Sequence, residues 1–350
     1  MSVRDDWPWQ VSQLVRRLTR KITKQNWLAI SGILCQLAES SPDEFLQSLE
    51  DDLREIYPQV HALFEETTSS GIRGTCVHCN LLWALETLAW APSRLLRVSK
   101  VLAQLTNAPI GGNSGNKPES SLLNIYRGWM PQTLATVEMR NRALSALSKT
   151  QPDQVFDIAM GILHRGRDIA FSSSRPSWRS DDVGSAEIVT DVECADVQRH
   201  AALLAFELAG NSTDKAIQLF ERYDMFDDAY RKRVLDSVEA ATKSASINEL
   251  RKIRKTLRHK IHWKLNRGSN NRDDLIQKDI SAIHNAYQNS EPTDLIEKHQ
   301  WLFEGYNCEL PEKNARKTSK EAEERLRTLR TEALREIFFA QGFSGIEALN

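Results

Sequence analysis

The sequence has few of the features that mark secreted and membrane-spanning proteins. Its 350 residues include five cysteines, an odd number, and Met1–Trp9 carries charges and a proline where a secretory leader needs an apolar core. The longest uncharged stretch of real apolar weight, Gln25–Ala38, is too short to cross a bilayer of about 30 Å hydrocarbon thickness. We therefore expect free thiols, a reducing cytoplasm and no membrane partner.

Signatures of catalysis and of cofactor binding are also missing. No nucleophile elbow, phosphate-binding loop, dinucleotide glycine fingerprint or set of kinase motifs occurs in the sequence. The glycines of Gly111–Gly115 come without the Lys-Ser/Thr pair that would hold a phosphate, so a flexible turn is the favoured interpretation. The net charge of −1 gives no overall attraction to nucleic acid or to a membrane surface. We expect no catalytic residue, no cofactor and no metal.

The sequence does contain one pattern that occurs four times. A Leu-Ala or Leu-Ser pair closes an apolar helix, and a residue that favours the start of a helix opens the next one. The copies are Leu37-Ala38 before Pro42, Leu88-Ala89 before Pro92, Leu147-Ser148 before Pro152, and Leu208-Ala209 before Thr213. Helical hairpins that recur at intervals of roughly 50 to 60 residues are typical of stacked α-solenoids. The pattern predicts an all-α fold, an α-solenoid of HEAT-like or TPR-like helical hairpins.

The apolar spacing and the charge divide the chain into three predicted parts. Residues 1–242 form the hairpin array, residues 243–311 a basic helical segment, and residues 312–350 a charged C-terminal helix. A capping box of Thr318 and Glu321 opens that helix, and Gly342 ends it. Since Ser344–Leu349 has the pattern of a further helix, the chain is either a fragment that continues into a missing region or a subunit whose last turn docks elsewhere. The first apolar stripes of the array are Trp9, Leu14, Leu18 and Ile22, then Trp27, Ile30, Leu34 and Leu37.

Two long segments interrupt the array. Asn107–Ser121 contains glycines and two prolines, and Arg165–Asp182 is rich in serine and arginine and contains Pro176 and Trp178. Loops of this length are uncommon within packed arrays and often carry function. We expect both to bridge hairpins whose stacking axis shifts; a contribution to binding specificity is the alternative.

Isolated candidates for chemistry have simpler structural interpretations. Cys76 and Cys79 have the spacing of half a zinc site, but no second close pair of ligands completes it, so buried thiols are favoured. Glu86 lies within an apolar helix, where a raised pKa would suit a general acid. A structural pair with Arg94 or Arg97 is the favoured interpretation.

The strongest local charge lies late in the chain. From Lys243 to Arg267, nine Lys or Arg residues accompany a single acidic residue, Glu249. Such a helix could neutralise phosphates, with binding that weakens as salt rises. A helix that is solvated or that pairs with acidic segments of the same array, such as Glu50–Asp52 or Asp227-Asp228, is favoured, with nucleic acid and an acidic protein as alternatives. The candidate partner-binding residues are Arg251, Lys252, Arg254, Lys255, Arg258 and Lys260, with Trp263 nearby for stacking.

Nine tryptophans are many for a chain of this length. Four lie in apolar helical contexts and are expected in the core between helices: Trp83, Trp90, Trp129 and Trp301. Trp7, Trp9 and Trp178 flank loops and prolines. Exposed tryptophans are frequent contact hot spots, and we expect one of these three to be exposed; Trp178 joins the candidate partner-binding residues.

Three runs of the sequence resemble a known group of proteins. Leu81–Pro92, Gly111–Thr133 and His299–Phe303 are similar to a long helical-repeat region of large bacterial proteins related to STAND-type NTPases and other antiviral-defence effectors. The resemblance extends from about Asp51 to Leu349. It implies a C-terminal sensor that grips a foreign protein and relays this to an effector. The chain itself has no ATPase or effector motif, and no sensing residue can be carried over, because no short motif fixes one.

The sequence as a whole predicts a non-catalytic helical-repeat recognition scaffold. The resemblance implies a bacterial cytoplasmic sensor or adaptor of antiviral defence, which binds a protein ligand such as a phage protein or an effector subunit. Binding would bury aromatic anchors within a polar rim. The alternative is a nucleic-acid-binding scaffold that uses the basic helix at 243–267, and a third is an enzyme with an unrecognised site.

Overall fold

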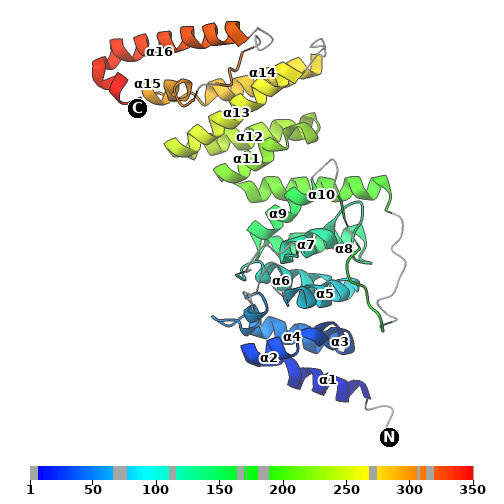
Figure 1. The fold of residues 1–350 in the computed structure, drawn as a ribbon. Coiled ribbons are helices and arrows are strands. Elements are labelled where there is room, and N and C mark those ends of the chain that lie inside the picture. The colour runs from blue at the N-terminus through cyan, green and yellow to red at the C-terminus, as the bar shows by residue number, and fades with distance from the viewer. Residues whose placement is uncertain are drawn as a thin grey trace. The chain divides into compact units, whose positions relative to one another are not determined.

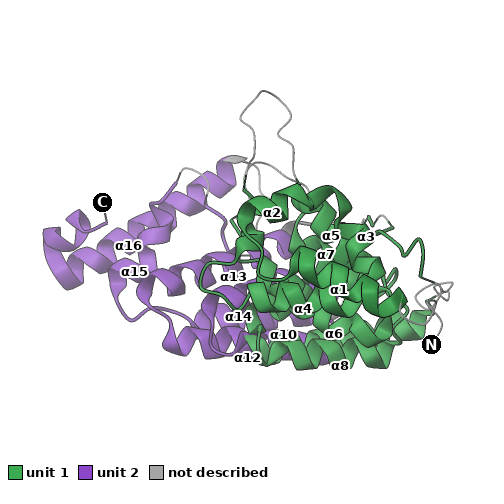
Figure 2. Ribbon diagram, turned by 90° about the horizontal axis from the view of Figure 1, so that it is seen from below, with its two compact units in different colours: residues 1–208 green, residues 209–350 purple. Residues whose placement is uncertain are grey.

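The structure is a computed structural model that describes residues 7–65, 77–109, 116–163, 169–170, 172–179, 189–267, 274–305, 308–312 and 319–349. Every regular element in these ranges is a helix, which confirms the predicted all-α helical-repeat fold. The chain divides into two compact units, residues 1–208 and 209–350 (Figure 2). The predicted boundary after residue 242 lies inside the second unit, because the helices on either side of it pack on one another.

Unit 1 is built from helices that pack on one another, and the longest connection between them runs from α9 to α10 (Figure 1). Its helices are α1 (Trp7–Thr19), α2 (Lys24–Ala29), η1 (Ser31–Ile33), α3 (Leu34–Ser40), α4 (Pro42–Asp52), η2 (Gln59–Leu63), α5 (His78–Ala89), η3 (Pro92–Arg94), α6 (Leu95–Leu105), α7 (Pro118–Tyr126), α8 (Val137–Ser148), α9 (Pro152–Ile162) and α10 (Asp191–Ala209). Helix α5 packs on α3, α6 and α7, and α8 packs on α6 and α9. Each helix therefore covers the apolar side of its neighbours.

The first three predicted hairpins form where the sequence places them, since α3 packs on α4, α5 on α6 and α8 on α9; for the fourth, the helices begin and end as predicted. Pro42 and Pro152 occupy the first turn of α4 and α9, where a missing N–H costs nothing. Pro92 opens the short helix η3, and α6 follows directly. Thr213 is the first residue of α11, with Ser212 as its cap. The core of these hairpins is mainly aliphatic with some aromatic residues, and it includes Leu37, Phe45, Leu85, Leu88, Leu102, Leu147 and Val155.

The first two apolar stripes are only partly as predicted. In α1 the buried residues are Val15 and Thr19, whereas Trp9 and Leu14 are exposed. Thr19 is buried because its hydroxyl donates to the Ser48 hydroxyl of α4, a polar contact that apolar spacing cannot reveal. The second stripe is split between α2 and α3, because η1 interrupts it.

The two predicted loops differ in outcome. The segment to Ser121 is not all loop, because Pro118 begins α7 and Ser121 is a buried residue of that helix. Residues 110–115 lie outside the described part of the chain. In the second segment, the described residues 169–170 and 172–179 have no regular secondary structure, as predicted; its other residues are not described.

The tryptophans predicted for the core also differ. Trp90 is buried, but Trp83 and Trp129 are 42% and 45% exposed, so the prediction for these two is wrong. Trp83 belongs to α5, whose other apolar residues already fill the faces against α3, α6 and α7. All three loop-flanking tryptophans, Trp7, Trp9 and Trp178, are exposed, rather than one of them.

Unit 2 contains α11 (Thr213–Glu221), η4 (Tyr223–Met225), α12 (Asp228–Ser244), α13 (Ile247–Arg267), α14 (Asp274–Asn289), α15 (Leu295–His299), η5 (Gln300–Leu302) and α16 (Ser319–Glu347). Helix α13 packs on α11, α12 and α14 through Ile253, Leu257, Ile261 and Leu265, a stripe of period four. Glu249, the one acidic residue of α13, accepts hydrogen bonds from the Ser246 amide and hydroxyl and so caps the helix.

The last helix is bent as the sequence predicts. Gly342 lies inside α16 with φ 67° and ψ −152°, so the chain reverses there before Ser344–Glu347 completes a further turn. The proposed capping residue Thr318 lies outside the described residues. Among the described helices, none combines the length and the apolar character needed to cross a bilayer.

Candidate protein-binding surface

The predicted basic residues of α13 belong to the interior of unit 2 more than to its surface. Arg254 is buried and donates to the Tyr287 carbonyl oxygen at 2.9 Å, and its guanidinium carbon lies 4.2 Å from the centre of the Tyr287 ring. Arg258 is buried as well, 4.1 Å from the centre of the Trp301 ring. These two cation–π contacts fasten α13 to α14 and to η5. Neither guanidinium is available to a phosphate.

Three further cations of α13 have carboxylate partners in the same unit. Arg251 binds Glu297 with two nitrogens, one of them at 2.6 Å. The Lys252 ammonium lies 3.5 Å from an Asp214 oxygen, and the Lys260 ammonium lies 3.0 Å from an Asp224 oxygen. Of the favoured predictions, the one in which the basic helix pairs within its own array is confirmed. The partners are not Glu50–Asp52, which belong to unit 1; Asp228 binds Arg231 and Lys278.

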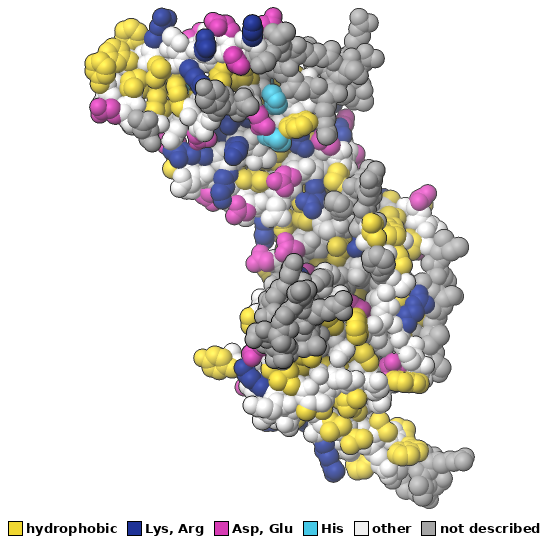
Figure 3. All heavy atoms as spheres, in the orientation of Figure 1, with side chains coloured by type: hydrophobic (Ala, Val, Ile, Leu, Met, Phe, Trp, Pro, Cys, Tyr) yellow, Lys and Arg dark blue, Asp and Glu magenta, His cyan; other side chains and the backbone are white. Residues whose placement is uncertain are grey.

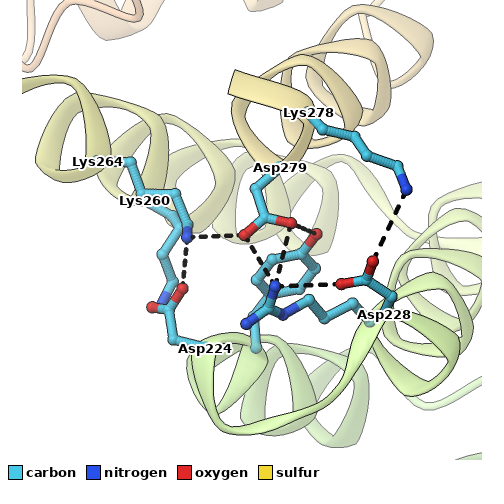
Figure 4. Close-up of polar contacts among 8 residues, drawn as sticks. Asp224, Asp228, Lys260, Lys264, Lys278 and Asp279 are labelled. Atoms are coloured by element: carbon cyan, nitrogen blue, oxygen red, sulfur yellow. Dashed lines mark hydrogen bonds and ion pairs between the residues drawn. The ribbon is translucent and has the colours of Figure 1, made fainter. Parts of the chain in front are cut away.

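Lys260, Asp224 and Asp228 belong to an ionic cluster between α11–η4, α12, α13 and α14 (Figure 4). Asp279 is at its centre: its carboxylate accepts from the Tyr223 hydroxyl at 3.3 Å and lies 3.2 Å from Arg231 and 3.3 Å from Lys264. Lys264 also pairs with Asp224. The sequence analysis did not single out Asp279 or Lys264. These two residues are 15 positions apart in the sequence and lie on different helices. They form an ion pair only because α13 and α14 pack together.

The cluster shifts the acidity of two of its members. Burial acts to raise the pKa of the Asp224 carboxyl, but hydrogen bonds and charges from Lys264 and Lys260 outweigh burial and lower it below its ordinary value. Burial and the neighbouring Asp279 carboxylate raise the pKa of the Tyr223 hydroxyl. Both groups therefore keep the charge state that favours the cluster at neutral pH, which is the behaviour of a structural ion network.

Lys255 is exposed, as are Arg251 and Lys252, but it differs from them in having no acidic partner within ion-pair distance among the described residues. It borders two hollows of about 150 and 650 Å³, and both also touch Arg258, Trp301 and Glu304. The larger hollow mixes Lys260 and His259 with carboxylates, so it has no uniform charge to attract a phosphate backbone.

The two predicted tryptophans are exposed but lie in different units. Trp263 is 44% exposed on α13, and its ring meets His259 edge-on at 5.9 Å. Trp178 is 66% exposed and belongs to unit 1. The remaining predicted residues all belong to unit 2. Consequently neither unit by itself carries all eight predicted residues on one surface.

A cluster of exposed aromatic side chains lies instead at the end of α16. We call Phe338, Phe339 and Phe343 the α16 aromatic cluster; their side chains are 43%, 85% and 76% exposed. The Phe338 ring contacts both others edge-on, with centroid distances of 6.3 Å to Phe339 and 5.1 Å to Phe343. Figure 3 shows hydrophobic side chains gathered over this end of α16 at the upper left.

The backbone holds this cluster together. The left-handed φ of Gly342 turns the chain back so that Phe343 reaches Phe338. The returning turn sits so close to α16 that a Cβ on Gly345 would lie 2.8 Å from carbon atoms of Ile337 and Gln341. Two glycines are therefore required for three exposed rings to meet.

The sequence contained a signal for this cluster that the apolar spacing did not capture. Leu326, Ala333 and Ile337 form the buried stripe of α16, and the first two pack in one cluster with Leu302. Phe338 and Phe339 follow Ile337 directly and so fall outside that stripe by about 100° and 200° around the helix. The pattern of two adjacent aromatic residues outside the buried face, Phe338 and Phe339, with Gly342 shortly after them, would have predicted an exposed aromatic cluster here.

The remaining candidates for chemistry have structural partners. Glu86 accepts from the Ser121 hydroxyl at 2.6 Å and from the Ser174 amide, not from Arg97, which binds Glu50 and Asp43. Burial raises the pKa of the Glu86 carboxyl. Cys76 lies outside the described residues; no group of three or more metal-ligating side chains occurs in the described part of the chain.

Comparison with known proteins gives no relative for this chain. No protein-family model, no curated protein and no solved structure matches it.

Proposed function

We propose that this protein is a non-catalytic helical-repeat scaffold that recognises another protein through the α16 aromatic cluster. The observation that carries the proposal is the meeting of Phe338, Phe339 and Phe343 on the surface across the reversal at Gly342. Full burial of one such ring is worth about 1.5–3 kcal/mol, so three rings left in water represent a large unused contribution to binding. Clustered exposed aromatics of this kind mark protein interaction sites and supply their hot spots.

The surroundings of the cluster favour a protein ligand over a nucleic acid. On α13, Arg251, Lys252 and Lys260 pair with Glu297, Asp214 and Asp224, and Arg254 stacks on an aromatic ring, which leaves Lys255 as the unpaired one of these cations within the described part of the chain. Arg330 of α16 is likewise engaged, since it donates to the carbonyl oxygens of Leu302 and Gly305. An apolar centre with polar groups around it has the composition of a protein interface.

The resemblance to sensor regions of bacterial antiviral-defence proteins supports a more specific proposal. The ligand would be a phage protein or an effector subunit, met in the bacterial cytoplasm. The chain would act as a sensor or adaptor, and the chemistry of defence would belong to its partner. This step depends on the sequence resemblance, whereas the binding surface depends on the described geometry.

The proposal is tested by affinity capture from bacterial cells, with and without phage infection. The bait is the full chain, compared with the double variant Phe339→Ser/Phe343→Ser and with Ile56→Ser. Ile56 is 87% exposed and belongs to unit 1, so Ile56→Ser removes a comparably exposed apolar side chain elsewhere. We expect a protein that the wild type and Ile56→Ser retain and the double variant loses. Equal recovery by all three baits would remove the cluster from the proposal, provided that thermal unfolding shows all three to be folded.

A further inference from the structure

A segment of unit 1 without regular secondary structure, with a bend at Ser177 and Trp178, lies against the helices. Residues 172–179, with the sequence Ser-Ser-Ser-Arg-Pro-Ser-Trp-Arg, form no helix or strand. We call them the strap. The strap crosses the connection after α7, then the end of α5, then α3, because its successive residues bind Gln132, Glu86 and Glu39 in that order.

The helices hold the strap mainly by its main chain. The Ser173 amide donates to Gln132 Oε1 at 3.0 Å, and the Ser174 amide donates to Glu86 Oε2 at 3.3 Å. The amides of Ser177 and Trp178 both donate to Glu39 Oε2, at 2.8 and 2.9 Å. In return, the Trp90 indole donates to the Ser174 carbonyl oxygen at 2.9 Å. These contacts recognise an extended backbone whatever its side chains are.

One strap side chain is recognised specifically. The Arg175 guanidinium carbon lies 4.1 Å from the centre of the buried Trp90 ring, a cation–π contact. Pro176 follows it, and a residue before proline is kept extended by steric clash. Proline also has no amide N–H, and the acceptors on the helices serve the residues on either side of it. An arginine followed by a proline therefore fits this position.

The acceptors are prepared for such a ligand. Glu39, Glu86 and Gln132 are 5%, 9% and 2% exposed. The Ser121 hydroxyl fixes the Glu86 carboxylate, and the Met130 carbonyl oxygen fixes the Gln132 amide, so both point their free oxygens at the strap. The strap contributes to this burial, and it supplies hydrogen bonds to all three acceptors.

The strap itself is a weakly anchored occupant. Its residues Ser172, Arg175, Ser177 and Trp178 are exposed, and Trp178 is 66% exposed although its amide is bound. No apolar strap side chain among the described residues is buried in the helices. The strap is therefore held by main-chain hydrogen bonds, by the Arg175 contact and by side-chain hydrogen bonds from Ser173 to Gln132 and from Arg179 to the Glu39 carbonyl oxygen, all of which a chain of similar sequence could reproduce.

We infer that the surface formed by Glu39, Glu86, Trp90 and Gln132 is a binding site for extended peptide segments with arginine followed by proline, which the strap occupies in cis and a partner protein's segment can occupy in its place. The inference deepens the proposed recognition function by adding a second kind of ligand. Its site belongs to unit 1 and its test uses a synthetic peptide, so a failure of the α16 aromatic cluster would leave it standing.

The test titrates a fluorescent peptide, Ser-Ser-Ser-Arg-Pro-Ser-Trp-Arg, into the full chain and follows anisotropy. A variant with a weakened strap, Arg175→Ala/Ser177→Pro, loses the cation–π contact and one amide donor while the acceptor residues stay intact. A tethered segment competes at an effective concentration on the order of millimolar, so we expect the variant to bind the peptide at least tenfold more tightly than the wild type does. Equal affinity of wild type and variant would overturn the inference.

Two control peptides distinguish sequence-specific binding of the peptide from nonspecific binding. A peptide methylated on the amide that corresponds to Ser177, and a peptide with alanine for the arginine, should each bind the variant at least tenfold more weakly. Equal binding of all three peptides would also overturn the inference. If the variant unfolds, the wild type is used instead, and its hydrogen exchange is compared with and without excess unlabelled peptide. The peptide should speed exchange of the Ser177 and Trp178 amides. Unchanged exchange would then contradict the proposed displacement.

Discussion

The Phe343 ring packs edge-on against the Phe338 ring, with centroids 5.1 Å apart, across the backbone reversal at Gly342. The two residues are five apart in sequence and would not meet on a straight helix, where neighbours are three or four apart. The reversal therefore creates a surface aromatic cluster that continuous helix could not. This relationship links a local backbone feature to the proposed recognition of a protein.

Substitution of Gly342 by alanine is expected to disperse the cluster. A Cβ is disfavoured at φ 67° and ψ −152°, by about 1–3 kcal/mol, so the last turn should leave its position. Hydrogen exchange of residues 343–349 should accelerate, while the free energy of unfolding of the rest of the chain stays unchanged. Gly32→Ala is the matched control, because the φ of Gly32 is not left-handed and the space that its Cβ would enter is open, with no atom within 4 Å. Unaltered exchange in Gly342→Ala would show that the reversal does not hold the cluster.

Loss of Asp279 is expected to destabilise unit 2. The Asp279 carboxylate is 13% exposed and serves Arg231, Lys264 and Tyr223, so Asp279→Ala leaves two cations short of a partner. We expect the free energy of unfolding in urea to fall by roughly 2–4 kcal/mol, near the value for breaking a buried ion pair. Asp214→Ala removes the exposed partner of Lys252 and should cost less than about 1 kcal/mol. Equal losses in the two variants would contradict the structural role of Asp279.

The Asp224 carboxyl should make stability depend on pH. Its pKa is lower in the folded chain than in the unfolded chain, where it is about 3.9, because Lys264 and Lys260 outweigh the effect of burial. Its contribution is therefore present above about pH 4 and is lost as the pH falls through the folded pKa. Since the side chain is about half exposed, Asp224→Asn should cost only about 0.5–1 kcal/mol at pH 7.

The check is urea unfolding of wild type and Asp224→Asn between pH 7 and pH 3. The difference between the two free energies of unfolding should shrink as the solution is acidified below about pH 4. A difference that stays constant over this range, or one that grows, would mean that Lys260 and Lys264 do not stabilise the Asp224 carboxylate.

Nucleic acid should bind weakly at most, because the cations of α13 are already paired. At about 50 mM salt we expect a Kd for DNA or RNA no tighter than roughly 10⁻⁴ M, with little dependence on salt. Lys255, the exposed cation of the helix without an acidic partner among the described residues, cannot by itself neutralise several phosphates. A filter-binding titration at several salt concentrations measures this. Tight binding with a logarithmic salt slope of about −4 or steeper would favour the nucleic-acid scaffold instead.

The hairpins could be predicted from sequence because their signals are local. Pro42 and Pro152 at first turns and the leucines before them determine where helices start and which side is covered. The exposed stripe of α1 could not be predicted in the same way, since the Thr19–Ser48 hydrogen bond, a long-range polar contact, selects the buried side.

The binding surfaces were harder to predict for a related reason. A run of arginines and lysines has the same sequence pattern whether its partners are phosphates or carboxylates. Asp279 lies beside Lys264 only because α13 packs on α14. The strap was recognised as an unusual loop, but its contacts with Glu39 join residues about 140 positions apart. The apolar periodicity of a helix predicts which side chains are buried. It does not predict which aromatic side chains, such as Phe339, are exposed.

The most direct test of the central claim is the affinity of the captured protein for three purified full chains, measured by calorimetric titration. Aromatic hot spots contribute about 2 kcal/mol or more each, so Phe339→Ser/Phe343→Ser should weaken the Kd at least 100-fold. Ile56→Ser should bind within threefold of the wild type. A double variant that binds as tightly as Ile56→Ser, with its fold intact, would contradict recognition through the α16 aromatic cluster.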